Sequence, residues 1–305
     1  MSVEGGTKAI VAALLANAGI AVTKFGAYLL TGSSSMLAES VHSVADSGNQ
    51  ALLLLGGKRA RRVATEAHPF GFGRERYLYA FIVAIVLFTV GGLFALYEAW
   101  HKFSDPHGID SWQWVPILVL VVAIVLESFS LRTAVRESNH VRGKRTWVEF
   151  VRGAKAPELP VVLLEDIGAL LGLVFALAGV SLTLVTGDGR WDAAGTAAIG
   201  LLLVAIAVVL ALETRSLLLG ESATPETVAA IRAALVGGSV VSVIHLKTLH
   251  VGPEEILLAA KIEVPGPVTA AEVAAQIDEA EARVRAAVPE VKFSYLEPDL
   301  RRPDL

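Results

Sequence analysis

The chain contains no cysteine among its 305 residues and only two methionines. Disulfides and thiolate metal sites are therefore excluded. Any metal ion would have to be bound by His, Asp, Glu, Asn or backbone oxygen atoms. Charged residues make up only 18% of the chain, which is below the roughly 25% typical of soluble domains.

Two further absences exclude classes of function. The net charge is −4 and the isoelectric point is about 6.0, so we expect no nucleic-acid partner. The sequence also has no G-x-x-x-x-G-K-[ST] run, which argues against a pump driven by ATP.

Apolar residues dominate the composition instead. They make up 54% of the chain, and the mean hydropathy is +0.58. A helix that crosses a lipid bilayer needs about 20 mostly apolar residues. The sequence predicts six such spans, at 8–30, 35–57, 77–100, 113–132, 160–185 and 193–213.

The second predicted span contains three ionisable residues, Glu39, His42 and Asp46. Such groups are costly at bilayer depth and usually mark an ion or proton path. His42 and Asp46 are one helical turn apart and Glu39 lies three residues before His42, so all three share one stripe. A histidine and a carboxylate at this spacing form half of a site for a divalent transition metal. A structural hydrogen bond is the alternative.

The fifth predicted span begins with Glu165 and Asp166, and Asp166 is the expected partner of His42 and Asp46. Adjacent helical residues point about 100° apart, so at most one of the two carboxylates should face His42. Alternatively, the span begins only after Asp166 and leaves both at the membrane interface.

Three other polar residues lie in the predicted spans. Lys24 is expected to extend towards the lipid headgroups, or else to neutralise a carboxylate inside the bundle. Asn17 is expected to form hydrogen bonds between helices. Glu127 lies near the end of the fourth span and is expected at the interface rather than as a ligand.

Lysine and arginine gather in two of the segments that connect the spans, around 58–76 and 136–155, whereas the opposite connections hold only Lys102 and Arg190. Basic segments remain on the cytoplasmic side. We therefore expect a multi-pass protein of the plasma membrane with both termini in the cytoplasm.

From about residue 220 the composition becomes that of a soluble domain. The pattern predicts helices at 225–236 and 269–287 and strands at 240–251, 256–264 and 291–296. This order predicts a small two-layer α+β domain. We therefore divide the chain into a membrane domain at 1–219 and a cytoplasmic domain at 220–305.

Two histidines of this second domain, His245 and His250, are five residues apart. On a strand they would face opposite sides and would not bind one metal ion together. We expect both at the surface.

Several runs of sequence resemble the cation diffusion facilitator family. Residues 31–50, which contain Glu39, His42 and Asp46, are similar to the second span of that family, and residues 68–77 (HPFGFGRERY) resemble the loop that follows it. Residues 164–166 (LED) and 295–299 (YLEPD) resemble the zinc-transporter-nine-like branch.

The resemblance implies an α-helical membrane protein with six transmembrane helices and a small cytoplasmic αββαβ, ferredoxin-like domain. It implies an antiporter, not an enzyme, that exports a divalent cation, usually zinc, in exchange for protons. Zinc and protons are then transported species, and no prosthetic group is expected. The same resemblance implies a homodimer formed through the C-terminal domain.

The resemblance also assigns metal ligands. His42 and Asp46 match the family's ligand pair on the second span, and Asp166 matches the later aspartate on the fifth. The earlier position of that second pair is Val162, which cannot bind a metal. Tetrahedral zinc then needs a fourth ligand, which Glu165, Glu39 or a water molecule would supply. The loss of an imidazole weakens the preference for zinc over manganese, iron or cobalt.

Protons and metal ions compete for such ligands, because metal binding needs neutral histidine and ionised carboxylates. Three alternatives remain open: an exporter of manganese, iron or cobalt with the same fold, a proton-coupled carrier of organic ions, and a non-transporting scaffold anchored in the membrane. The cost of burying the ionisable stripe argues against the scaffold.

Overall fold

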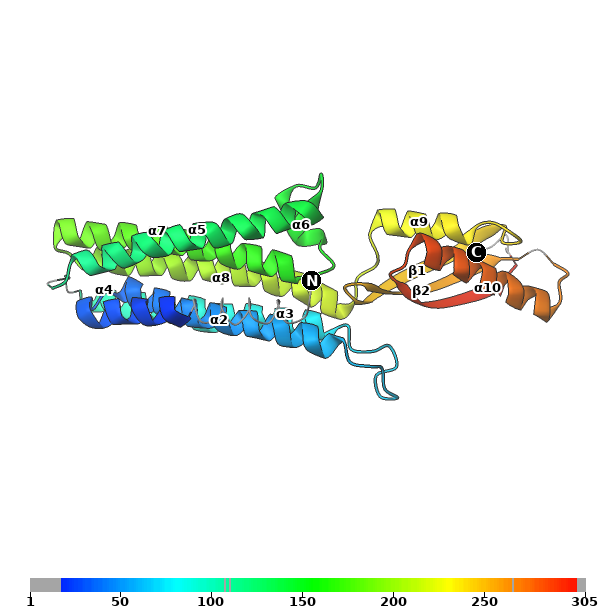
Figure 1. Cartoon of the computed structure of the whole chain (residues 1–305), viewed down its shortest axis with the longest axis horizontal. Coiled ribbons are helices and arrows are strands. Elements are labelled where there is room, and N and C mark those ends of the chain that lie inside the picture. The colour runs from blue at the N-terminus through cyan, green and yellow to red at the C-terminus, as the bar shows by residue number, and fades with distance from the viewer. Residues whose placement is uncertain (1–17, 107, 110, 265, 301–305) are drawn as a thin grey trace. The chain divides into compact units, whose positions relative to one another are not determined.

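The computed structural model describes residues 18–106, 108–109, 111–264 and 266–300. The chain divides into two compact units (Figure 1). The helical unit contains the chain up to Gly56 together with Tyr79–Arg152 and Pro157–Thr214, and the C-terminal unit contains Gly57–Leu78, Gly153–Ala156 and the chain from Arg215. The first ten residues of the predicted first span, with Asn17, lie outside the described residues.

Long helices account for almost all of the first unit. They are the helix Ala18–Thr31, α2 (Ser34–Ala60), α3 (Glu75–Val86), the π-helix η1 (Leu87–Leu93), α4 (Phe94–Ser104), α5 (Trp114–Arg142), the short α6 (Trp147–Gly153), α7 (Glu158–Thr186) and α8 (Arg190–Leu219). The segments α3, η1 and α4 follow one another without a break and form one helical run, Glu75–Ser104.

Four of these helices are long and apolar enough to cross a membrane: Glu75–Ser104, α5, α7 and α8. The helix Ala18–Thr31 is apolar but shorter within the described residues. The 27 residues of α2 include a row of buried polar side chains. The predicted fourth span ends too early at 132, because α5 continues to Arg142. The short α6 was not predicted.

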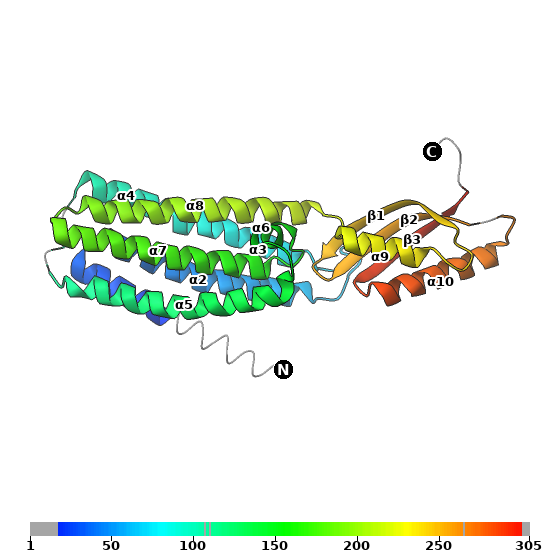
Figure 2. The same ribbon diagram turned by 90° about the horizontal axis from the view of Figure 1, so that it is seen from above.

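Small residues let the helices approach closely. A Cβ atom at Gly92 would lie 2.7 Å from Cγ2 of Val204, and one at Gly200 would lie 2.7 Å from Cγ of Leu96. These contacts lock η1 and α4 against α8 around buried leucines such as Leu203. Helices α5 and α7 lie side by side along their length (Figure 2).

The start of α2 is capped by a residue from α8. Asp192 is buried, and its carboxylate accepts hydrogen bonds from the backbone N–H groups of Ser34 (2.8 Å) and Ser35 (3.2 Å). The hydroxyl groups of Ser33 and Ser34 also donate to it. The first N–H groups of a helix have no partner within the helix. Asp192 supplies that partner and so fixes the position at which α2 begins.

The C-terminal unit contains a three-stranded sheet and two helices. Its elements are α9 (Pro225–Leu235), β1 (Ser242–Gly252), β2 (Glu255–Glu263), α10 (Ala270–Ala287) and β3 (Val291–Asp299). The sheet order is β1-β2-β3, with β1 antiparallel and β3 parallel to β2. Alternate residues of β2 are buried, and side chains such as Leu258, Ile231 and Val284 form the core between the sheet and the helices.

The prediction that both histidines of this unit lie at the surface is wrong for His250, which is only 4% exposed. Register shifts between Val243 and His245 and between His250 and Gly252 interrupt the regular pairing of β1. Nδ1 of His250 lies 3.2 Å from the carbonyl oxygen of Gly252. Burial, the largest effect, lowers the pKa of His250, so its neutral form is favoured.

Candidate metal centre

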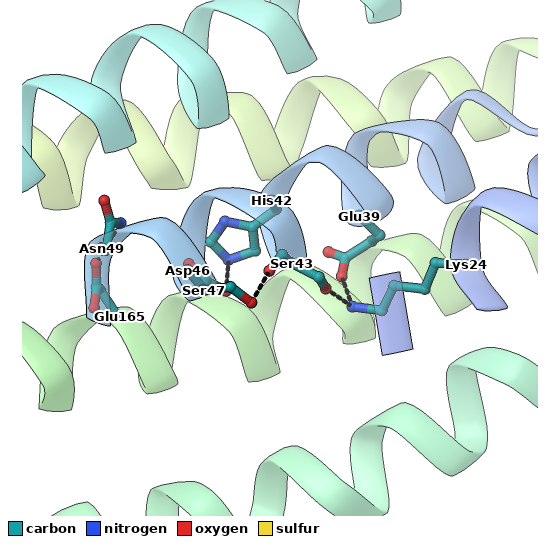
Figure 3. A network of polar contacts seen from close by, with 8 residues as sticks. All are labelled: Lys24, Glu39, His42, Ser43, Asp46, Ser47, Asn49 and Glu165. Carbon is teal, nitrogen blue, oxygen red and sulfur yellow. Dashed lines mark hydrogen bonds and ion pairs between the residues drawn. The ribbon is translucent and has the colours of Figure 1, made fainter. Parts of the chain in front are cut away.

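The polar stripe predicted for α2 is present. His42 is 1% exposed, and its Nε2 lies 3.5 Å from Oδ2 of Asp46, whose side chain is 18% exposed (Figure 3). Within the described residues, neither ring nitrogen of His42 has a hydrogen-bond partner, and neither has Oδ1 of Asp46. Buried polar atoms in folded proteins are nearly always paired. This pair therefore has free coordination capacity in the interior of the bundle.

A cavity of about 290 Å³ adjoins this pair. Its wall is rich in carboxylates, which come from three helices: Asp46 from α2, Glu127 from α5, and Glu165 and Asp166 from α7. Val162 also lines the cavity, one turn before Asp166 on the helix. The structure therefore places Asp46 and the two predicted α7 carboxylates at one cavity. His42 is not among the lining residues but contacts Asp46, which is.

The two α7 carboxylates have different partners. Glu165 is buried, and its Oε1 accepts a hydrogen bond of 2.7 Å from Nδ2 of Asn49 on α2. Oδ2 of Asp166 accepts a bond of 3.0 Å from the hydroxyl of Ser130 on α5. Both residues lie within α7, which begins at Glu158.

Glu127 was expected at the interface rather than as a ligand. In the structure it lines the same cavity as Asp46 and Asp166. Glu127 reaches the cavity because α5 packs along α7. A sequence does not show which helices are neighbours.

The expectation that Lys24 extends to the headgroups is also wrong. Lys24 is 2% exposed, and its Nζ donates to Oε2 of Glu39 (2.9 Å) and to Oγ of Ser43 (2.8 Å). Glu39 is fully buried by this contact and does not line the cavity. Figure 3 shows the resulting order along α2, with Lys24 and Glu39 at one end of the stripe and Asn49 with Glu165 at the other.

A π-helical segment lies next to His42. A Cβ atom at Gly91 in η1 would lie 3.9 Å from Nδ1 of His42. π-Helical turns are rare and frequently occur at functional sites. The backbone of η1 therefore lies against the imidazole of His42.

Among residues 18–106, 108–109, 111–264 and 266–300, no three His, Asp or Glu side chains are close enough to hold a metal ion together. The structure thus gathers Asp46, Glu165 and Asp166 around a cavity, with His42 next to it, without closing them into a coordination shell. Carboxylates and one imidazole at such a cavity can bind a divalent cation or take up protons once the side chains converge.

Comparisons with known proteins place this arrangement in a family. Residues 10–219 match the model of the cation efflux transmembrane domain. The chain is 31% identical over 272 residues, 88% of its length, to the Proton-coupled zinc antiporter SLC30A9, mitochondrial, of Xenopus laevis. It is 31% identical over 268 residues (87%) to the human protein of the same name and 28% identical over 266 residues (85%) to Metal tolerance protein C4 of Arabidopsis thaliana.

The chain spans about half the length of these relatives, namely 48%, 47% and 57% of them. The names of the first two also overturn one expectation. They place those relatives in mitochondria, so the predicted location in the plasma membrane is wrong, whereas a multi-pass membrane protein agrees with the apolar helices. The chain belongs to the cation efflux family, also called the cation diffusion facilitators, and within it to the branch of zinc transporter nine.

Proposed function

We propose that the protein is a proton-coupled antiporter that moves a divalent transition-metal cation, with zinc as the favoured substrate, across a membrane. The observation that supports this most strongly is the cavity lined by Asp46 of α2 and Asp166 of α7. Next to Asp46 lies His42, whose ring nitrogens have no hydrogen-bond partner among the described residues. The names of the zinc-antiporter relatives support the same substrate and coupling ion. They also point to a mitochondrial membrane.

In this proposal the two domains of the chain have different roles. Residues 1–219 form the transport domain, in which the helix containing Ala18–Thr31 and α2 complete six spans with the four apolar helices. Residues 220–305 form a ferredoxin-like domain through which two copies dimerise. The cation leaves the side of the membrane that carries the basic segments.

The proposed ligands are His42 and Asp46 from α2 and Asp166 from α7. Glu165 or Glu127 supplies the fourth oxygen ligand in place of Val162, since both line the cavity. Glu39 is not included, because it is not among the residues that line the cavity and its Oε2 is held by Lys24.

Exchange follows from competition for these atoms. A divalent cation needs the imidazole neutral and the carboxylates ionised. Histidine titrates near pH 6.5 when unperturbed, so a modest proton gradient changes its charge. Protons that enter from the far side occupy the ligands and release the cation. They leave to the opposite side when metal binds again.

A second candidate is an exporter of manganese, iron or cobalt. The cavity wall is rich in carboxylates, and the described residues contribute no imidazole to it. Oxygen ligands suit harder cations such as manganese better than an imidazole-rich site does. The two candidates share a mechanism and differ only in the preferred ion.

The test is a flux measurement on purified full-length protein in sealed vesicles. With an inward proton gradient, the wild type should move zinc faster than without it, and His42→Ala and Asp46→Ala should abolish the flux. Ser47→Ala is the matched control, because its hydroxyl donates only to Ser43 on the same helix (3.1 Å). Zinc flux in Asp46→Ala at the wild-type rate would contradict the proposal, and faster manganese flux in the wild type would favour the second candidate.

A further inference from the structure

A buried lysine on the helix Ala18–Thr31 contacts the polar stripe of α2 at the end that holds Glu39 (Figure 3). The ammonium group of Lys24 is held at two points, by Oε2 of Glu39 at 2.9 Å and by Oγ of Ser43 at 2.8 Å. Ser43 lies one turn before Asp46 on α2.

The positive charge of Lys24 matters because of the carboxylates that line the cavity. Among the described residues, the cavity wall holds four carboxylates, Asp46, Glu127, Glu165 and Asp166, and no lysine or arginine. Such a wall attracts a divalent cation strongly, because charges interact over long distances in an interior of low dielectric constant. A carrier, in contrast to a storage site, must also release its cargo.

We propose that Lys24 is an internal counter-cation of the metal centre, a fixed positive charge that weakens cation binding enough for the ion to leave. Lys24 is a positioning residue that acts through space and is not a ligand. Glu39 holds it and offsets part of its charge. This inference rests on the proposed function, since it assigns a role at the same metal centre.

The burial of the pair supports this role over a purely structural one. Replacing a buried ion pair by apolar residues is often neutral or stabilising, so such a pair is weak evidence for stability. Ser40, which is also on α2, already links the same two helices by a hydrogen bond of 3.1 Å to the carbonyl oxygen of Ala21. A helix contact at this level therefore does not require two charges.

The experiment measures zinc binding to full-length protein in detergent at about pH 8 by calorimetry. Lys24→Met removes the positive charge, and we expect zinc to bind about tenfold more tightly. Glu39→Gln leaves the lysine uncompensated, and we expect zinc to bind about tenfold more weakly. The double variant Lys24→Met/Glu39→Gln removes both charges and should return to within about threefold of the wild type.

The test is decisive because the two single variants are expected to change the zinc affinity in opposite directions. If Lys24 and Glu39 only hold two helices together, both single variants weaken binding, and that result would overturn the inference. If Glu39 is itself a ligand, the double variant loses zinc binding, which also contradicts it. The double variant, in which no buried charge is left unpaired, shows whether a weak single variant has merely failed to fold.

Ser40→Ala is the matched control, because it removes a polar contact between the same helices without a change in charge. It should bind zinc like the wild type. A wild-type protein that binds no zinc would contradict the proposed function and the inference together. If the wild type binds zinc but both single variants change its zinc affinity in the same direction, only the inference is contradicted.

Discussion

Two polar clusters lie in the same helical unit and differ in whether their hydrogen bonds are satisfied. Both carboxylate oxygens of Asp192 accept bonds from Ser33, Ser34 and Ser35. In the other cluster, both ring nitrogens of His42 and Oδ1 of Asp46 have no partner within the described residues. A saturated cluster stabilises the fold, whereas a buried cluster with unpaired atoms is costly unless something binds there. This is the difference that we expect between a structural anchor and the proposed metal site.

The two buried histidines repeat this comparison. His250 in the C-terminal unit is next to the carbonyl oxygen of Gly252. His42 has a carboxylate at 3.5 Å, and within the described part of the chain its ring nitrogens have no hydrogen bond. Burial is thus common to both histidines, and the missing hydrogen bond is what distinguishes the proposed ligand.

Loss of a proposed ligand should have the largest effect. We expect Asp166→Ala to lower zinc flux at least about 100-fold, since even residues behind metal ligands contribute about 10- to 100-fold. The melting temperature should stay near that of the wild type, because only the bond from Ser130 is lost. Flux assays and thermal melting of the same preparation measure both, with Glu137→Ala, an exposed carboxylate on α5, as the control. If Asp166→Ala lowers the melting temperature strongly and flux falls only with it, Asp166 would be a structural residue like Asp192.

The saturated cluster should give the opposite result. Asp192→Ala leaves several buried N–H and O–H groups without an acceptor, and we expect the free energy of unfolding to fall by about 3 kcal/mol. Thermal melting should report this as a clear drop. The control is Asp188→Ala, which removes an exposed carboxylate that caps only its own loop through the N–H of Arg190 (2.9 Å). Equal melting temperatures for the two variants would show that Asp192 is not an anchor.

A substitution that adds a ligand sharpens the assignment of the cavity. Val162→His places an imidazole in the wall beside Asp166, and we expect the preference for zinc over manganese to rise about tenfold. Competition between the two metals in the vesicle flux assay measures this ratio, with Val162→Leu as a control for volume. An unchanged ratio would mean that Val162 does not face the transported ion.

The smallest effect should come from His250. Its pKa is lowered in the folded state, chiefly by burial. The unfolded chain therefore binds the proton more readily, and stability is complete above about pH 6.5 and declines as the pH falls below it. Hydrogen exchange of the β1–β2 amides, corrected for intrinsic rates, should show weaker protection at pH 5.5 than at pH 7. His250→Gln should remove that dependence, and if the dependence persists in this variant, another group is responsible.

Much of the helical architecture was predictable because it depends on local composition. Apolar runs of sufficient length predicted the four long apolar helices to within a few residues, apart from the end of α8, which continues to Leu219, and the end of α5, which continues to Arg142. There the last turns contain residues such as Arg132, Arg136 and Arg142, and a polar helix that continues beyond the apolar run gives no hydropathy signal. The spacing of Glu39, His42 and Asp46 on one stripe was equally local.

What was missed depends on contacts between distant segments. Whether Lys24 extends to the headgroups or pairs with a carboxylate depends on the face that α2 presents to the preceding helix. Glu127 enters the cavity because α5 packs along α7, which no spacing within α5 reveals. The burial of His250 depends on register shifts in β1. In each case, a neighbour far away in the sequence decides the environment.

The bond between Asp192 and the start of α2 also has a mechanical consequence. Ser34 and Asp46 are twelve residues apart, which corresponds to about 18 Å along a helix axis. If α2 tilts about its anchored end by roughly 5°, Asp46 moves by about 1.5 Å, which is most of the length of a bond of about 2.0–2.2 Å between zinc and oxygen. A helix that is clamped at one end thus works as a lever, in which a small rotation at the fulcrum is enough to make or break coordination at the other end.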